Sequence, residues 1–230
     1  MSKHRAFWNK EYKTAEHLAL SDEPSEDLEK FIRFLERLEG RKSLNVTTRA
    51  LDLGCGNGRN LILLAQYGMR GTGYDISDEA VKIAKKNSDG LPLEYEARSI
   101  AGKFEKIPDA SQTIVLDMMT SHFLKKSERD VLKEEVLRVL KPGGWYLFKT
   151  FLADEDQHVA RLLRESPADE EGAYIHPRIG VYEYVYSEAG IYEFFEPEFI
   201  IHKVDRSYKH VKDGKAFKRR TIAVYMQKAL

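Results

Sequence analysis

The segment Leu51–Asn60 (LDLGCGNGRN) is the part of the sequence best suited to do chemistry. An apolar strand pattern leads into glycines at three alternate positions, and a helical pattern follows at once. Glycine lets the main chain adopt turn dihedrals that a side chain forbids and lets it approach a ligand closely. In open α/β sheets, ligands bind in the crevice at the carboxyl ends of the strands. The segment therefore predicts a ligand site at the end of the first strand.

A single acid, Asp75, ends the next predicted strand, 21 residues after Gly54. An ionised carboxylate only accepts hydrogen bonds, which suits the two hydroxyls of a ribose. The dinucleotide fingerprint places its third glycine five positions after the first. That position is Arg59 here, and the third glycine is Gly58. The pattern therefore indicates a nucleoside ligand, and its spacing disfavours NAD.

Short apolar runs alternate with helical patterns around this loop, which predicts βαβ units and a parallel sheet covered on both faces. Strands are expected at 50–53, 71–75, 93–97, 113–117 and 145–151, with helices at 60–67, 77–87 and 127–140. Two further helices are expected before them, at 7–18 and 25–39. Strands at 199–208 and 219–227, with Asp213-Gly214 in the turn between them, predict an antiparallel hairpin. We expect a helix and loops over the sheet edge in 153–191.

Composition excludes several classes of protein. The 230 residues hold 37 Lys plus Arg and 37 Asp plus Glu, so the chain is not basic throughout, and 42% hydrophobic residues argue against disorder. Cys55 is the only cysteine, which excludes an internal disulfide and a cysteine-built zinc site, and we expect no metal. No run approaches the roughly 20 apolar residues of a membrane span, and the N-terminus has no signal-peptide pattern. We therefore expect a cytoplasmic protein with no membrane contact.

The glycine loop resembles motif I (D-x-G-x-G-x-G) of the class I S-adenosylmethionine-dependent methyltransferases. Three more segments resemble that family in the same order: 73–77 (GYDIS), 108–117 (PDASQTIVLD) and 137–144 (LRVLKPGG). The resemblance covers about residues 48 to 151. It departs from the family at Gln112-Thr113, where Phe-Asp is frequent, and at Ser99, where an adenine-binding acid is frequent.

The resemblance implies an α/β fold: a Rossmann-like, seven-stranded, mostly parallel sheet with helices on both faces and an antiparallel C-terminal hairpin. We expect residues 1–45 to form an N-terminal helical cap and residues 46–230 a single compact domain. The implied cofactor is S-adenosyl-L-methionine. The residues expected to bind it are Trp8, Tyr12, Asp52, Gly54, Cys55, Gly56, Asn57, Asp75, Ile76, Ser99, Ile100, Asp117 and Met118.

Roles follow from the resemblance for most of these residues. Asp52, the loop and the following helix would hold the methionine part, and Asp75 the ribose. Ile76 and Ile100 would enclose the adenine, and Asp117-Met118 would lie near the reactive methyl. Trp8 and Tyr12, four positions apart on a helix, would act as a lid; core packing is the alternative.

Two residues are candidates for a catalytic base, His122 and Asp117. Histidine is a common general base, but His122 can equally be a packing residue. Cys55 is interpreted as a small residue in a tight loop. His176, Tyr174 and Tyr182 are weaker candidates for an acceptor pocket.

These observations predict methyl transfer to a nucleophilic atom of a small-molecule acceptor, since no appended recognition domain is visible. Two alternatives stay open: an RNA or protein methyltransferase, and a non-catalytic S-adenosylmethionine-binding protein. The first would use the basic C-terminal hairpin, whose cations are Lys203, Arg206, Lys209, Lys212, Lys215, Lys218, Arg219 and Arg220. We favour a solvated hairpin whose lysines block aggregation. The sequence leaves the acceptor atom and the oligomeric state open.

Overall fold

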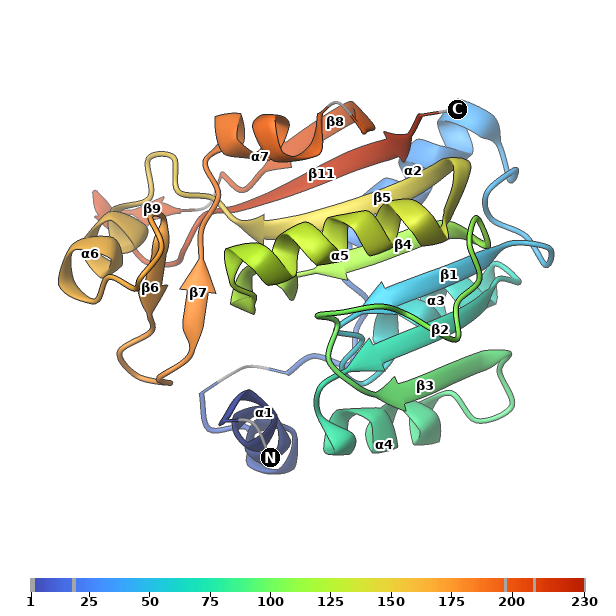
Figure 1. Ribbon diagram of the computed structural model, residues 1–230, viewed down its shortest axis with the longest axis horizontal. Helices are drawn as coiled ribbons and strands as arrows, with labels where there is room; N and C mark the ends of the chain where they lie inside the picture. Colours follow the sequence, from blue (N-terminus) through green and yellow to red (C-terminus); the bar gives the residue numbers. More distant parts are fainter. Residues whose placement is uncertain (1–2, 18–19, 197, 209, 230) are drawn as a thin grey trace.

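A seven-stranded sheet organises the computed structural model, which describes residues 3–17, 20–196, 198–208 and 210–229 (Figure 1). Its strand order is β3-β2-β1-β4-β5-β11-β8. The first five strands are parallel, and β11 runs antiparallel to both β5 and β8. The bounds are β1 Arg49–Leu53, β2 Arg70–Asp75, β3 Leu93–Ala97, β4 Gln112–Met118, β5 Leu140–Phe151, β8 Phe199–Arg206 and β11 Thr221–Lys228. The predicted Rossmann-like α/β fold is confirmed.

Helices cover both faces of this sheet (Figure 1). Helices α5 and α7 lie on one face, and α2 and α3 lie on the other. The bounds are α1 Lys3–Thr14, α2 Glu26–Glu39, α3 Arg59–Gln66, α4 Asp78–Asn87, the 3₁₀ helix η1 Ser121–Phe123, α5 Lys126–Val139, α6 Gln157–Glu165 and α7 Glu188–Phe195. In the part of the chain that the structure describes, no helix has the length and apolar character needed to cross a bilayer.

Side chains alternate between the two faces along each strand, as the strand period of two requires. Leu51 and Val115 pack in the core under α5, whereas Ile114 and Leu116 pack in the core on the α2 side. Strands β1 and β4, at the centre of the sheet, are buried on both faces; their middle residues are apolar, and an acid lies near each carboxyl end. Those ends meet at one edge of the sheet, where the functional loops gather.

The two N-terminal helices have different surroundings. Helix α2 belongs to the core, and the Phe31 ring lies edge-on to Tyr225 with 5.0 Å between centroids. Helix α1 packs instead beside α4, where Arg5 Nε donates to Asp78 Oδ2 at 2.8 Å and Ser77 Oγ donates to Asn9 Oδ1 at 2.8 Å. The predicted helix end at Leu18 lies outside the described residues, and α1 ends at Thr14. The predicted domain boundary at residue 45 stays a prediction.

Several element boundaries differ from the sequence prediction. Helix α5 begins at Lys126 rather than Ser127, because the Glu128 carboxylate accepts a hydrogen bond from Lys125 N at 2.9 Å. The region 153–191 also contains a small antiparallel pair, β6 Ala173–Ile175 with β7 Tyr182–Tyr184. The Asp213-Gly214 turn, with positive φ at both residues as a two-residue hairpin turn requires, closes a separate ribbon between β8 and β11. That ribbon pairs β9 Val211–Lys212 with β10 Lys215–Ala216.

Candidate functional site

The loop after β1 cannot tolerate a side chain at its glycines. Gly54, Gly56 and Gly58 all have positive φ, at 76°, 56° and 85°. A Cβ on Gly54 would lie 2.1 Å from Thr120 Oγ1, and one on Gly56 would lie 2.4 Å from the Tyr12 hydroxyl. Both distances are far inside van der Waals contact. The spacing of the glycines therefore reflects both backbone conformation and close approach by other elements.

Asp75, at the carboxyl end of β2, is held beside this loop by main-chain donors. Gly56 N donates to Asp75 Oδ2 at 2.9 Å, and Ser77 N donates to Oδ1 at 2.8 Å. Burial raises the pKa of Asp75 to about 6, and the two N–H groups oppose that shift. A carboxylate oxygen can accept two hydrogen bonds. Each oxygen of Asp75 therefore keeps one acceptor position for a ligand.

The loop and Asp75 lie in the wall of a cavity of about 210 Å³ that is partly open to solvent. Most of the residues predicted to bind cofactor also line it: Trp8, Tyr12, Gly54, Cys55, Gly56, Asn57, Asp75, Ile76, Ser99, Ile100 and Met118. Further lining residues were not predicted: His4, Leu20, Ser21, Arg59, Asn60, Met119, Thr120, Phe123 and Leu124. The structure thus brings residues from α1, four strand ends and the segment before α2 to one space.

Two predicted cofactor residues, Asp52 and Asp117, lie beneath the cavity rather than in its wall. Asp52 is buried, and neither carboxylate oxygen has a hydrogen-bond partner among the described residues. Burial, with smaller contributions from the charges of Asp75 and Asp117, raises the pKa of Asp52 to about 8. Asp52 therefore holds its proton at neutral pH.

Asp117 fixes the turn after β4. Its Oδ1 accepts hydrogen bonds from Ser121 N at 3.1 Å and Thr120 N at 3.3 Å, and its Oδ2 accepts one from the Tyr146 hydroxyl at 3.2 Å. Burial raises its pKa. These bonds hold Thr120 against Gly54, a contact that sequence reasoning missed. Leu53 of β1 pairs with Asp117 of β4, so the residues that follow the two strands lie side by side. This strand register is the signal that would have indicated the contact between Gly54 and Thr120.

Met119 adopts a left-handed conformation in the same turn, with φ of 69°. A non-glycine residue in this region is uncommon and marks a constrained backbone. Met119 N donates to Lys149 O at 2.9 Å, which ties the turn to β5. The turn presents Met118, Met119 and Thr120 to the cavity, and η1 adds Phe123.

His122 is placed behind the cavity wall. Its ring is 1% exposed, and neither ring nitrogen has a hydrogen-bond partner among the described residues. It packs against Phe123 and Phe151, with ring centroids 4.0 and 5.1 Å away. Burial lowers the pKa of His122 to about 4. The ring is therefore neutral at physiological pH.

The other acceptor-pocket candidates lie on β6 and β7 or the turn between them, outside the cavity wall. Tyr174 is buried, and its hydroxyl donates to Glu183 Oε2 at 2.6 Å. Arg219 forms an ion pair with the same Glu183 and lies over the Phe151 ring. Tyr182 donates to Glu170. Tyr174 and Tyr182 therefore contribute to the packing of the β6–β7 pair.

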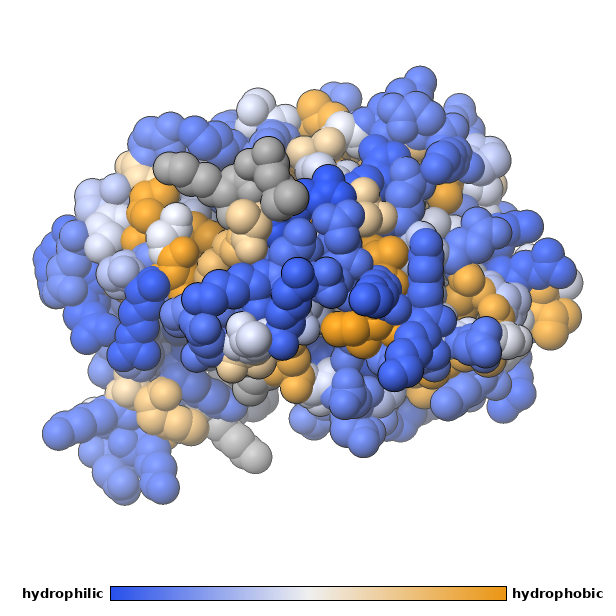
Figure 2. All heavy atoms as spheres, turned by 90° about the horizontal axis from the view of Figure 1, so that it is seen from below, coloured by the Kyte–Doolittle hydropathy of each residue, from blue (hydrophilic) through white to orange (hydrophobic). Residues whose placement is uncertain are grey.

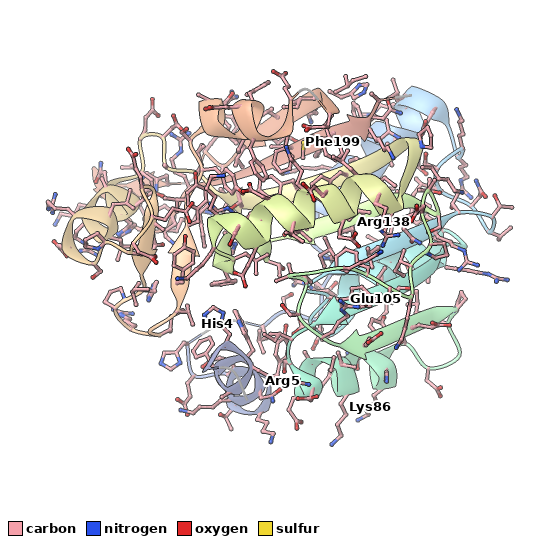
Figure 3. All side chains as sticks on the ribbon, viewed as in Figure 1. His4, Arg5, Lys86, Glu105, Arg138 and Phe199 are labelled. Atoms are coloured by element: carbon pink, nitrogen blue, oxygen red, sulfur yellow. The ribbon has the colours of Figure 1, made fainter. Side chains whose placement is uncertain are left out.

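Helix α1 and the segment after it cover the loop. Trp8 meets Phe123 edge-on, with 5.3 Å between ring centroids. Asn57 Nδ2 donates to Asp22 Oδ1 at 2.8 Å, and Arg59 Nη1 donates to the carbonyl of Ser21 at 3.2 Å. Figure 3 shows Arg5 on the side of α1 that faces α4, with His4 beside it. Ser21 and Asp22, in the described part of the connection from α1 to α2, thus lie over the glycine loop.

The surface is mostly hydrophilic on the side of α1 and α4, where apolar side chains form small, separate patches (Figure 2). Many cations of the C-terminal region are paired: Lys203 with Asp205, Arg206 with Glu188, Arg219 with Glu183 and Arg220 with Glu155. Lys212, Lys215 and Lys218 form no ion pair with a residue that the structure describes. Acids thus neutralise much of the basic cluster.

Comparison with known proteins identifies the fold and the loop. The family model described as a methyltransferase domain matches residues 51–148. The glycine/sarcosine/dimethylglycine N-methyltransferase of Actinopolyspora halophila is 30% identical over 141 residues, which cover 60% of this chain and 25% of that protein. A putative methyltransferase of Bacillus subtilis is 33% identical over 154 residues, 58% of this chain and 60% of the relative. The chain thus spans between a quarter and three fifths of these relatives.

Solved structures agree on the fold. A SAM-dependent methyltransferase from Methanosarcina mazei superposes with a TM-score of 0.68 and 23% identity, covering 83% of this chain and 96% of that one. The 1,6-didemethyltoxoflavin-N1-methyltransferase of Burkholderia thailandensis, solved with that compound and S-adenosylhomocysteine, gives a TM-score of 0.69. Its identity is 16%, over 99% of this chain and 88% of the neighbour. Residues 51–148, which include the glycine loop and Asp75, are thus similar to a methyltransferase domain, and the chain shares the fold of these solved S-adenosylmethionine-dependent methyltransferases.

Proposed function

We propose that the protein transfers a methyl group from S-adenosylmethionine to a small-molecule acceptor. The observation that carries this proposal is the placement of Asp75 and the glycine loop in the wall of one cavity that Trp8, Met118 and Phe123 also line. One side of the wall offers hydrogen-bond acceptors and close backbone, and another offers apolar side chains to a second molecule. That division suits a reaction between a nucleoside and a separate acceptor.

The residues present fit the cofactor. The backbone at Gly54 and Gly56 leaves no room for a Cβ, and Asp75 keeps free acceptor positions for ribose hydroxyls. Ile76 and Ile100 line the cavity beside Asp75 and would enclose the adenine, with Ser99 at its edge. Helix α3 begins at Arg59, and the positive end of its dipole suits the methionine carboxylate.

S-adenosylmethionine, when bound, supplies a methyl group that its sulfonium already activates. The protein then has to orient the acceptor and exclude water, and such positioning is worth up to roughly 7–11 kcal/mol in favourable intramolecular reactions. Trp8, Met118 and Phe123 are placed for this role. Asp117 would act indirectly, by fixing the turn that carries them. His122 as a proton acceptor stays a prediction, because its ring lies behind the wall.

The names of relatives support a small-molecule acceptor. They include the glycine/sarcosine/dimethylglycine enzyme, a ubiquinone biosynthesis O-methyltransferase of Burkholderia vietnamiensis and the didemethyltoxoflavin enzyme. The pairing of the C-terminal arginines with acids also makes that region less suited to nucleic acid than its composition implies. An assay of methyl-transfer turnover distinguishes the proposed enzyme from a non-catalytic S-adenosylmethionine-binding protein.

Isothermal calorimetry with S-adenosylhomocysteine tests the proposal. Wild-type protein should bind it and should not bind NAD. Asp75→Asn should weaken binding by about 1–3 kcal/mol, the cost of losing a charged hydrogen-bond acceptor at a buried site. Asp89→Asn, the same change at an exposed position after α4, is the matched control. Binding of NAD alone, or equal affinity in the Asp75 variant, would contradict the proposal.

A further inference from the structure

The end of the cavity beside Asp75 is formed by the segments that follow β2 and β3. Ile76 comes directly after Asp75, Ser99 and Ile100 come after β3, and all three line the cavity. We infer that the site, which takes the sugar of its nucleoside on Asp75, does not read the exocyclic amine of the base and therefore accepts cofactors substituted at that nitrogen. The inference rests on the proposed function, which assigns the adenine to these residues.

Strand register brings the two segments together. Asp75 pairs with Ala97 across β2 and β3, and Arg98 N donates to the carbonyl of Asp75 at 2.8 Å. The chain therefore leaves β3 directly beside Asp75, and Ser99 is the next residue. A ribose on Asp75 would carry its base toward the space between the two segments.

Asp75 is the only carboxylate among the described residues that line the cavity. Main-chain donors at Gly56 and Ser77 hold its two oxygens, and its remaining acceptor positions are those proposed for the ribose hydroxyls. An amino group that loses water on binding needs an acceptor of its own. The described residues thus supply no charged acceptor for the exocyclic amine.

The charged side chains that precede Ser99 are engaged elsewhere. Arg98 lies over the Tyr74 ring, with 4.8 Å from its Cζ to the ring centroid. Glu96 forms an ion pair with Lys106, with 2.9 Å between nitrogen and oxygen. Neither Arg98 nor Glu96 lines the cavity. Ser99 is therefore the polar side chain left to meet the amine.

Ser99 is poorly suited to select for an amine. It is exposed, and its hydroxyl oxygen already accepts a hydrogen bond from Ala101 N at 3.1 Å. A site strongly rejects an analogue that lacks an N–H when its own buried polar group is left unpaired. Water can pair with the exposed hydroxyl of Ser99 instead, so this penalty is absent. The same exposure lets a substituent on the amine meet solvent rather than packed side chains.

Calorimetry with three compounds tests the inference: S-adenosylhomocysteine, its N6,N6-dimethyl analogue and its 2′-deoxy analogue. The dimethyl compound has no hydrogen to donate at the exocyclic nitrogen but keeps every ring nitrogen, so main-chain contacts with the ring are unaffected. Wild-type protein should bind it within about fivefold of S-adenosylhomocysteine, since only an exposed, neutral hydrogen bond is lost. The 2′-deoxy compound should bind about tenfold more weakly or worse, because it leaves an acceptor position of Asp75 unpaired.

The outcomes separate the inference from the proposed function. A loss of affinity greater than about fivefold for the dimethyl compound would show that the site reads the amine, and it would overturn the inference alone. If S-adenosylhomocysteine itself does not bind, the proposed function is overturned. A 2′-deoxy compound that binds as tightly as S-adenosylhomocysteine would contradict the ribose role of Asp75 in the proposed function.

Ser99→Asp should create the selectivity that wild type lacks. A carboxylate there would accept a hydrogen bond from the amine of S-adenosylhomocysteine, whereas the dimethyl compound cannot donate one. The ratio of the two dissociation constants should therefore rise about fivefold or more, less than for a buried charged hydrogen bond because the position is exposed. Ser127→Asp makes the same change at an exposed position of α5 and should leave the ratio unchanged.

An unchanged ratio in a folded Ser99→Asp variant would overturn the placement of Ser99 at the amine. Circular dichroism and the urea midpoint establish whether that variant is folded. If it is not, the comparison of the parent and dimethyl compounds on wild-type protein decides, because it needs no substitution.

Discussion

Replacing Asp52 by asparagine removes a buried acid without changing its shape. Asp52 lies under the glycine loop, and neither of its oxygens has a hydrogen-bond partner among the described residues. Its pKa is raised to about 8, first by burial and then by Asp75 and Asp117. The folded protein therefore binds a proton there that the unfolded chain releases near pH 4.

The direction of the effect follows from proton linkage. Because the folded pKa lies above the unfolded one, the free energy of unfolding is highest at low pH and falls as pH rises from about 4 to about 8. Each pH unit inside this window costs about 1.4 kcal/mol, so Asp52 alone should remove up to about 4 kcal/mol between pH 5 and pH 8. Asparagine at position 52 cannot ionise, so it should abolish this loss.

Urea unfolding at pH 5, 6, 7 and 8 measures the effect. The free energy of unfolding of Asp52→Asn minus that of wild type should increase with pH, by up to about 4 kcal/mol over the range. Asp89→Asn, at an exposed site, should show a constant difference from wild type. A constant difference for the Asp52 variant as well would mean that Asp52 is ionised in the folded protein, and the reasoning about its burial would be refuted.

Three further predictions concern the lid, the buried histidine and the lysines in and just after the β9–β10 ribbon. Trp8→Ala should weaken S-adenosylhomocysteine binding by about 1 kcal/mol, the scale of one aromatic contact with the ligand; unchanged calorimetric affinity would remove Trp8 from the lid. His122→Leu should make the protein less sensitive to acid. The pKa of His122 in the folded protein is lowered to about 4. The free energy of unfolding of wild type should therefore fall by up to about 3 kcal/mol as pH falls from about 6.5 to 4. Equal acid sensitivity in urea titrations would contradict this, whereas a hundredfold loss of turnover with intact cofactor affinity would support His122 as the proton acceptor. Replacing Lys212, Lys215 and Lys218 by glutamine should leave methyl transfer unchanged and abolish any weak, salt-sensitive RNA retention. If wild type instead still binds RNA at 150 mM salt and the variant does not, the result would favour the RNA alternative.

The parallel half of the sheet was predictable because local patterns and global fold agree there. Strand β3 begins and ends where the alternation of apolar and charged residues predicts, and the Ser77 hydroxyl caps α4 by accepting from Ala80 N at 3.1 Å. The glycine loop and Asp75 were predictable for the same reason, since the loop joins β1 to α3 and Asp75 ends β2, three elements that follow one another in the sequence. Predicting either of them requires only residues that are close together in the sequence.

Contacts between distant segments could not be read from the sequence. The β6–β7 pair is only three residues long on each strand, and its pairing depends on side-chain contacts such as Tyr174 with Glu183. The contact of Thr120 with Gly54 depends on strand register, and the left-handed Met119 depends on a bond to β5. His122 was chosen for its residue type and its place after β4, but burial against Phe151 is a tertiary property.

A crystal structure of the protein with S-adenosylhomocysteine tests the central claim most directly. The account predicts that the ribose hydroxyls lie within hydrogen-bond distance of the Asp75 carboxylate and that the amino-acid end lies along Gly54–Gly58, with the sulfur facing Met118. A nucleoside bound elsewhere, or an Asp75 carboxylate still bonded only to Gly56 N and Ser77 N with the ligand out of reach, would contradict it.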